Sequence, residues 1–188
     1  TPASLVFNID EAGEDDYVDT HSYNVIVQSD FQDKSINIPV RRRQKRSTLV
    51  HCISCDGTYL KPLLIIPRKT VDSIIFKKLT PANLLIKYQQ KGFSNSELIK
   101  FWLENILFPV IEEKLQIENE RSDYEGYSYL IIDGCSSHAK ALQNYNLEEK
   151  RIKIIFLVPH ASHLLQQLDM VIFSLQKMYT TRKVISEK

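Results

Sequence analysis

Apolar residues gather in short continuous runs along this chain, and two of these runs end directly at an acidic residue. The run through Ile132 leads into Asp133-Gly134 and a group of small polar residues, and the run at 5–9 leads into Asp10. Such runs between turn residues are typical of strands buried on both faces. Because open α/β sheets build their active sites at the carboxyl ends of strands, both acids are candidate site residues.

The remaining β-rich runs predict a mixed sheet. Residues 47–54 and 59–67 are joined by Asp56-Gly57, a strong hairpin signal, and with residues 5–9 they predict three adjacent strands, at least two of them antiparallel. Residues 84–88 form either a further short strand or an apolar connection. Residues 152–158 follow the run at 127–132 after about the length of a crossover helix, which predicts a parallel pair.

Two segments carry helical signals. Ser94 and Glu97 form a capping box that predicts a helix start, and apolar residues then recur at helical spacing, with Trp102 expected in the core. Pro109 should kink or split this helix. A second amphipathic helix is predicted from residue 164 onward, with Asp169 near its start, where the helix dipole favours a carboxylate.

Length and composition set broad limits. The 188 residues suit one domain, which we expect to span 1–188, and no run approaches the roughly 18 apolar residues of a membrane span. The chain begins with Thr1-Pro2, so we treat it as a fragment. Three cysteines do not make a disulfide framework, and Cys52 and Cys55, spaced as C-x-x-C in a predicted strand, are expected to be buried structural thiols in a reducing compartment.

The net charge of +1 gives no global basic signature, so any nucleic-acid contact must come from local patches. One local patch stands out, with five cations in six residues: Arg41, Arg42, Arg43, Lys45 and Arg46. A solvated loop, a phosphate-contacting patch and a nuclear import signal are all compatible with this composition.

Asp10, Asp133 and Asp169 together indicate a chemistry. On neighbouring strands Asp10 and Asp133 would lie about 4.8 Å apart, and carboxylates that close raise each other's pKa unless a cation neutralises them. Mg²⁺ or Mn²⁺ is the natural partner of oxygen ligands, and two such ions roughly 3.5–4 Å apart activate an attacking oxygen and stabilise a leaving one. The three acids therefore favour phosphodiester transfer.

The same residues carry a family resemblance. The blocks at 8–11, 133–138 and 159–169 resemble the three acidic blocks of DDE-superfamily transposases, most closely the pogo/Tigger branch of the Tc1/mariner group, and the segment 90–93 leading to 101–103 resembles that branch's connecting segment. The resemblance implies an α/β, RNase H-like fold: a mixed five-stranded sheet, three strands antiparallel and two parallel, with helices on both faces.

The resemblance also implies a function. It predicts a nuclear enzyme that cuts transposon-end DNA and joins the freed 3′-hydroxyl to target DNA, with two Mg²⁺ or Mn²⁺ ions held by Asp10, Asp133 and Asp169, and assembly as a homodimer on DNA. The helix-turn-helix region that the family carries upstream would lie outside this fragment. The candidate DNA-binding residues are Arg41, Arg42, Arg43, Lys45, Arg46, His138 and His163.

Two departures and several alternatives accompany this interpretation. The family usually has proline at the position of Gln167 and threonine at that of Ala12, which could relax the packing behind the acids. His138, His160 and His163 with Asp133 could suggest a zinc site, but the last two histidines lie in a predicted turn rather than at i, i+4 on a helix. These histidines could instead orient the carboxylates or contact DNA phosphate. The rival class is a domesticated or decayed domain that binds DNA or protein without cutting.

Overall fold

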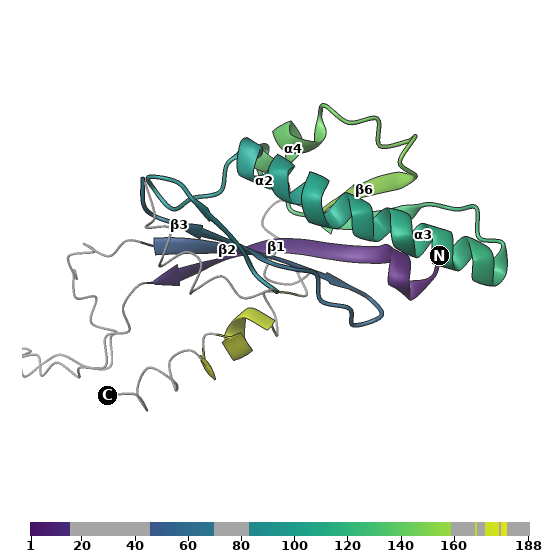
Figure 1. Cartoon of the computed structure of the whole chain (residues 1–188), viewed down its shortest axis with the longest axis horizontal. Coiled ribbons are helices and arrows are strands. Elements are labelled where there is room, and N and C mark those ends of the chain that lie inside the picture. Colours follow the sequence, from purple (N-terminus) through teal and green to yellow (C-terminus); the bar gives the residue numbers. More distant parts are fainter. Residues whose placement is uncertain (16–45, 70–82, 159–167, 169–171, 177, 180–188) are drawn as a thin grey trace, which may run out of the picture.

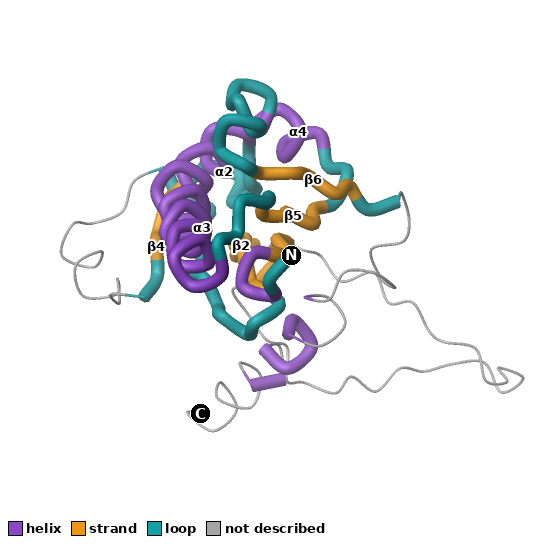
Figure 2. Tube along the Cα trace, turned by 90° about the vertical axis from the view of Figure 1, so that its right-hand side faces the viewer, coloured by secondary structure: helices purple, strands orange, loops and turns teal. Residues whose placement is uncertain are grey.

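A single mixed sheet runs through the described part of the chain (Figure 1). The computed structural model describes residues 1–15, 46–69, 83–158, 168, 172–176 and 178–179. Within them the sheet has six strands, in the order β4-β3-β2-β1-β5-β6, so that β4 and β6 lie at opposite edges (Figure 2). The strands are β1 (Val6–Asp15), β2 (Arg46–Ser54), β3 (Leu63–Ile66), β4 (Leu85–Tyr88), β5 (Ser128–Ile132) and β6 (Ile152–Phe156).

The strand directions confirm the predicted mixture. β2 is antiparallel to both β1 and β3, while β5 is parallel to both β1 and β6. Residues 84–88, for which the sequence predicted either a strand or a connection, contain β4. This strand pairs in parallel with β3 and adds a sixth strand to the five predicted. β1 is the strand at which the antiparallel and parallel halves of the sheet meet.

β1 is longer than its apolar run predicts, so Asp10 lies inside the strand and not at its end. The strand continues to Asp15 because it pairs with β2 over nine residues, from Phe7 to Asp15. Its pairing with β5 stops much earlier, at Asn8 and Ile131. Asp10 therefore follows the end of the parallel contact while it is still held by the antiparallel one.

The predicted long helix is split as Pro109 indicated. α2 (Ser96–Trp102) leads into a π-helical turn, η2 (Leu103–Leu107), and then into α3 (Phe108–Ser122), whose first turn contains Pro109. Proline has no amide hydrogen and is best tolerated in a first helical turn. The predicted cap was wrong by one residue: Asn95, and not Ser94, accepts a hydrogen bond from the Leu98 amide, at 2.9 Å.

Helical segments lie on both faces of the sheet, as predicted (Figure 1). α2, η2 and α3 pack on the face that carries Phe7 and Ile9, and Trp102 is fully buried there with its Nε1 donating to the Lys61 carbonyl. A short 3-10 turn, η1 (Ala3–Leu5), precedes β1, and α4 (Ser136–Leu142) connects β5 toward β6. On the opposite face a smaller apolar cluster contains Ala12, Leu168 and Phe173.

The cysteines correct one expectation. All three are free thiols, but only Cys52 is buried, while Cys55 and Cys135 are exposed. Cys55 lies just beyond the end of β2, where the chain turns into the hairpin, so the strand no longer covers it. None of the described helices is long and apolar enough to cross a membrane.

Candidate active site

Asp10 and Asp133 are related through the pairing of two adjacent parallel strands, β1 and β5. The last paired residues of β1 and β5 are Asn8 and Ile131, and each acid lies two positions further along its own strand direction. Two residues along a strand return to the same face of a sheet. The two acids, 123 positions apart in the sequence, therefore follow the same parallel pairing, and the closeness of their carboxylates stays a prediction.

The segment after β5 folds back on Asp133. The amide of Cys135 donates to Asp133 Oδ1 at 3.2 Å, which stabilises the turn between the strand and α4. α4 begins at Ser136, and its first turn carries His138 back over the end of β5. The side chain of Asp133 remains 37% exposed, so a ligand can reach it from solvent.

His138 joins Asp133 to a second carboxylate. Its Nδ1 lies 2.6 Å from Asp133 Oδ1, and its Nε2 lies 3.0 Å from Glu11 Oε1. The imidazole is 1% exposed, whereas the Glu11 side chain is 20% exposed. Three elements, β1, α4 and β5, are therefore connected by one imidazole between two carboxylates.

The electrostatics of this group follow from the two contacts. Burial alone lowers the pKa of His138, but the hydrogen bonds and charges of Asp133 and Glu11 outweigh it and raise the pKa to about 10. His138 is then an imidazolium at neutral pH and donates from both ring nitrogens. The hydrogen bond from His138 in turn holds the pKa of Asp133 below its ordinary value, against an opposing effect of burial. His138 therefore places a positive charge beside Asp133 and Glu11.

Asp10 lies on the opposite face of β1 from Glu11, because successive side chains alternate. Its Oδ1 accepts a hydrogen bond from the Glu11 amide at 2.8 Å. Across the ladder Asp10 pairs with His51 of β2, whose ring lies 5.0 Å from the ring of Phe173. Ala12, two residues along the same face, packs with Leu168. The residue directly before Asp169 is therefore buried against the face of β1 that carries Asp10.

Several predicted site residues lie outside the described part of the chain. They are Asp169, His160, His163, Arg41, Arg42, Arg43 and Lys45. Arg46 is described, as the exposed first residue of β2. His138 departs from its expected role in DNA contact, because it is buried and both ring nitrogens are engaged by carboxylates. The alternative that it orients a carboxylate agrees with this geometry.

The donor set suits a hard divalent cation only in part within these residues. No three histidine, cysteine or acidic side chains of the described ranges are grouped closely enough to hold a metal ion. Asp10 and Asp133 each carry a carboxylate, and carboxylate oxygens are the ligands that Mg²⁺ and Mn²⁺ prefer. Asp169, the third predicted ligand, lies outside the described residues, whereas the preceding Leu168 is described and packs with Ala12.

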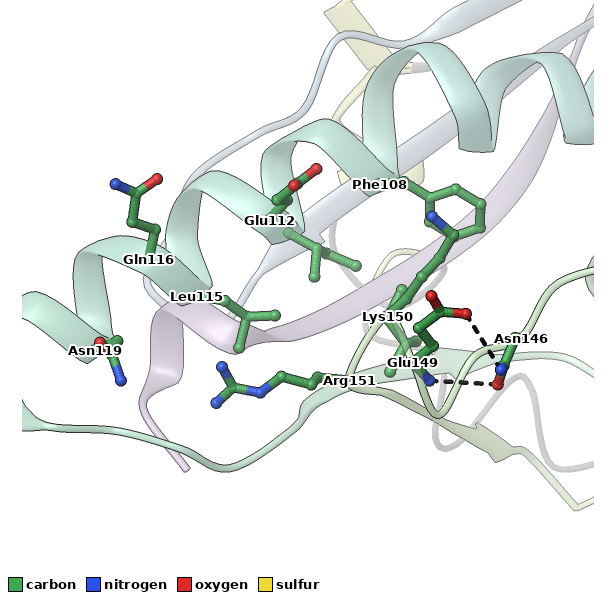
Figure 3. Close-up of a pocket in the computed structure, with 11 residues that line it drawn as sticks. Phe108, Glu112, Leu115, Gln116, Asn119, Asn146, Glu149, Lys150 and Arg151 are labelled. Carbon is green, nitrogen blue, oxygen red and sulfur yellow. Dashed lines mark hydrogen bonds between the residues drawn. The ribbon is translucent and has the colours of Figure 1, made fainter.

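Two hollows differ in their relation to this site. A cavity of about 650 Å³ lies between α3 and the segment before β6, with Phe108 and Leu115 on one side and Lys150 and Arg151 on the other (Figure 3). Neither Asp10, Glu11 nor Asp133 lines this cavity. A smaller hollow of about 340 Å³ borders Glu11 and is also lined by Gly13, Arg46, Thr48, Phe93 and Phe173.

Glu11 is the site residue to which the sequence assigned no role. It stood inside the Asp10-Glu11 motif, but its contact with His138 joins residues 127 positions apart. A second acid directly after a strand acid is the available signal, since consecutive side chains point to opposite faces and the second must find its own partner.

Comparison with known proteins decides the family. The sequence model of the DDE superfamily endonuclease family matches residues 43–187. The chain belongs to this family. Asp133 and Asp169 fall inside the matched segment of the DDE superfamily endonuclease, and Asp10 precedes it.

The fold of this DDE superfamily endonuclease is RNase H-like and is similar to that of Mos1 transposase. The crystal structure of a pre-cleavage Mos1 transpososome matches with a TM-score of 0.53 and 17% identity, over 98% of this chain and 48% of that one. The Mos1 mariner paired-end complex with Mn matches with a TM-score of 0.52 and 16% identity, over 98% and 48% of the two chains. The chain thus spans about half the length of these transposases.

One curated relative is named as a transporter and not as a transposase. A protein called MFS-type transporter clz9, from Cochliobolus lunatus, is 25% identical over 137 residues. The matched region is 73% of this chain but only 14% of the relative. The similarity therefore concerns a small part of that protein.

Proposed function

We propose that this chain is the catalytic part of a pogo/Tigger-like transposase, which cuts DNA at transposon ends and joins the freed 3′-hydroxyl to target DNA. The observation that supports the proposal is the parallel pairing of β1 and β5, because Asp10 and Asp133 each follow its last paired residues by two positions. Family membership supports the endonuclease activity. The blocks around the three acids, together with the segment from Gln90 to Phe93, support the pogo/Tigger branch.

In this proposal Asp10, Asp133 and Asp169 hold two Mg²⁺ or Mn²⁺ ions. The bound ions would supply the positive charge that activates the attacking oxygen and stabilises the leaving one. The packing of Leu168 against Ala12 supports a place for Asp169 beside Asp10. The burial of Ala12, which is 3% exposed, also indicates that the alanine in place of the family's threonine is well packed.

The protein's own residues would position the DNA. We propose that the cations at 41–46 contact phosphates on both sides of the scissile bond, since basic side chains provide the sequence-independent part of DNA affinity. Arg46 and the exposed Phe93 line the hollow beside Glu11, where a strand leaving the acids would pass. The DNA partner, a homodimer assembled on it and a nuclear location belong to the same proposal.

The test is cleavage of supercoiled plasmid DNA by the full protein, with Mg²⁺, Mn²⁺ or a chelator. Metal-dependent nicking that Asp133→Asn abolishes, and that the matched surface variant Asp123→Asn retains, would support the proposal. Asp123 ends α3 in a left-handed conformation that asparagine also adopts, so this control should fold normally. DNA binding without nicking in either metal would instead assign the chain to the rival class of binding domain.

A further inference from the structure

The two oxygens of the Asp133 carboxylate are not equivalent. Oδ1 is engaged twice, by His138 Nδ1 at 2.6 Å and by the Cys135 amide at 3.2 Å. Within the described residues, no hydrogen bond to Oδ2 accompanies them. Because Asp133 follows the last residue of β5 and its side chain is 37% exposed, the sheet alone does not fix its rotamer.

The group that engages Oδ1 is itself held rigidly. His138 is 1% exposed and cannot turn without breaking its contact with Glu11, at 3.0 Å on the other ring nitrogen. Glu11 belongs to β1, which is paired on both sides over part of its length. The orientation of Asp133 is thus tied to the central strand of the sheet through one imidazole.

We propose that Glu11 and His138 are positioning residues, which hold Asp133 by Oδ1 so that Oδ2 is presented to a divalent cation. This inference rests on the proposed metal-dependent function and deepens it. Neither residue would touch the cation or the DNA: His138 acts through Asp133, and Glu11 acts through His138.

The physical basis is the cost of leaving a ligand free to rotate. The contact between His138 Nδ1 and Asp133 Oδ1 is short, at 2.6 Å, and the imidazole is buried, so it restricts Asp133 to one rotamer before any cation arrives. Partners that orient a metal ligand typically change metal affinity by about 10- to 100-fold when removed.

Two isosteric substitutions separate the contacts of His138. The side-chain amide nitrogen of asparagine lies about where histidine has Nδ1, and that of glutamine lies about where histidine has Nε2. His138→Asn therefore keeps the donor to Asp133, whereas His138→Gln keeps the reach toward Glu11 and loses that donor. We expect His138→Gln to weaken Mn²⁺ binding by about 10-fold or more, and His138→Asn to bind Mn²⁺ more tightly than His138→Gln.

Glu11→Gln tests the indirect contact, with Glu118→Gln as its matched control. Glu118 is a buried glutamate with a single long-range hydrogen bond, from Ser4, on the far part of α3. Mn²⁺ affinity is measured on the full protein by electron paramagnetic resonance of free Mn²⁺, and folding by thermal melting without metal. Glu11→Gln should weaken Mn²⁺ binding while Glu118→Gln leaves it unchanged, even where the two variants melt at similar temperatures.

The result that would overturn the inference is equal Mn²⁺ affinity in folded wild type, His138→Gln and Glu11→Gln. A purely structural role of His138 would also make the asparagine and glutamine variants equal in affinity once both are folded. If the wild type binds no Mn²⁺, the proposed function fails, but the inference is still decided by NMR couplings that report the Asp133 χ1 rotamer in metal-free protein. One rotamer in wild type and several in His138→Gln support positioning, and identical populations in both overturn it.

Discussion

His138 and His51 are buried almost equally, at 1% and 2% exposure, yet the pKa values of their imidazoles are shifted in opposite directions. His51 lies in β2, where its Nδ1 contacts the Tyr59 hydroxyl and its Nε2 has no hydrogen-bond partner among the described residues. Burial therefore lowers its pKa to about 4. His138 is buried between two carboxylates, which raise its pKa to about 10. The contacts of each imidazole, and not its depth of burial, therefore determine whether it is charged at neutral pH.

This contrast predicts how stability depends on pH in metal-free protein. His51 binds its proton near pH 6.5 when unfolded and near 4 when folded, so the free energy of unfolding should fall as the pH falls through that window, by up to about 1.4 kcal/mol per unit. The contribution of His138 is fully present below pH 6.5 and should be lost as the pH rises toward 10. Urea unfolding from pH 4 to 10 measures both. His51→Leu should weaken the pH dependence of the free energy of unfolding only between about pH 4 and 6.5. An unchanged dependence in that range would contradict the lowered pKa of His51.

Asp133→Asn should abolish metal-dependent cleavage and also lower stability. Removal of like charge from the acids alone would suggest a neutral or favourable effect on folding, but the structure reverses that expectation. The substitution removes a carboxylate from a buried imidazolium, and breaking one partner of a buried charged pair is destabilising. Thermal melting of Asp133→Asn beside Asp123→Asn measures this. A melting temperature above that of the wild type would show that carboxylate repulsion outweighs the pairing with His138.

Three glycines predict a graded series of alanine variants. Gly92 has φ +71°, and a Cβ there would overlap the Arg46 carbonyl oxygen, so Gly92→Ala should be the most destabilising. Gly57 has φ +87° with nothing within 4 Å of a Cβ, so Gly57→Ala should cost about 1–2 kcal/mol from the backbone alone. Gly134 has neither constraint, and Gly134→Ala should stay within about 0.5 kcal/mol. Chemical denaturation gives the order, and any other ranking would contradict the backbone described for these turns.

Lys114 of α3 should stabilise the hairpin between β2 and β3. Its Nζ lies 2.7 Å from Asp56 Oδ2, 3.1 Å from Thr58 Oγ1 and 3.3 Å from Ser54 Oγ. Lys114→Met should lower the free energy of unfolding by about 1–3 kcal/mol, because hydrogen bonds to a charged group are lost. Lys140→Met, on an exposed helical position, is the control and should be close to neutral. Denaturant titration compares the two, and equal values would show that the contacts on Nζ contribute nothing net.

The basic run at 41–46 should determine part of the salt dependence of DNA binding. If Arg43 contacts a phosphate, Arg43→Ala should weaken binding and reduce the slope of log affinity against log salt by about one. Arg121→Ala removes a cation from the exposed end of α3 and should leave the slope unchanged. Titrations at several salt concentrations make the comparison, and identical slopes in wild type and Arg43→Ala would favour a solvated loop or an import signal.

The sequence correctly predicted those features of the fold that depend on residues close together in the chain. The apolar run before Asp133, the hairpin at Asp56-Gly57 and the helix break at Pro109 each depend on a few neighbouring residues, and all three are confirmed. Asn95 replaced Ser94 as the cap because both residue types cap well and only the backbone conformation selects between them.

The features that the sequence did not predict depend on distant pairing. β1 continues past Asp10 because β2 extends alongside it, and no periodicity within residues 6–15 records the presence of that partner. The link from Glu11 through His138 to Asp133 joins two strands and a helix, so only the folded topology brings the groups together. The sign of the Asp133 pKa shift depended on the same contact.

The position of β1 between the two halves of the sheet has a consequence for the order of synthesis. Asp10 is synthesised 123 residues before Asp133. At a translation rate of about 5–20 residues per second, this is a difference of roughly 6–25 seconds. β2 and β3 are synthesised before β5, so β2 can pair with β1 and β3 during translation. The antiparallel half of the sheet can therefore form first, and the pairing of β1 with β5 has to follow the synthesis of β5.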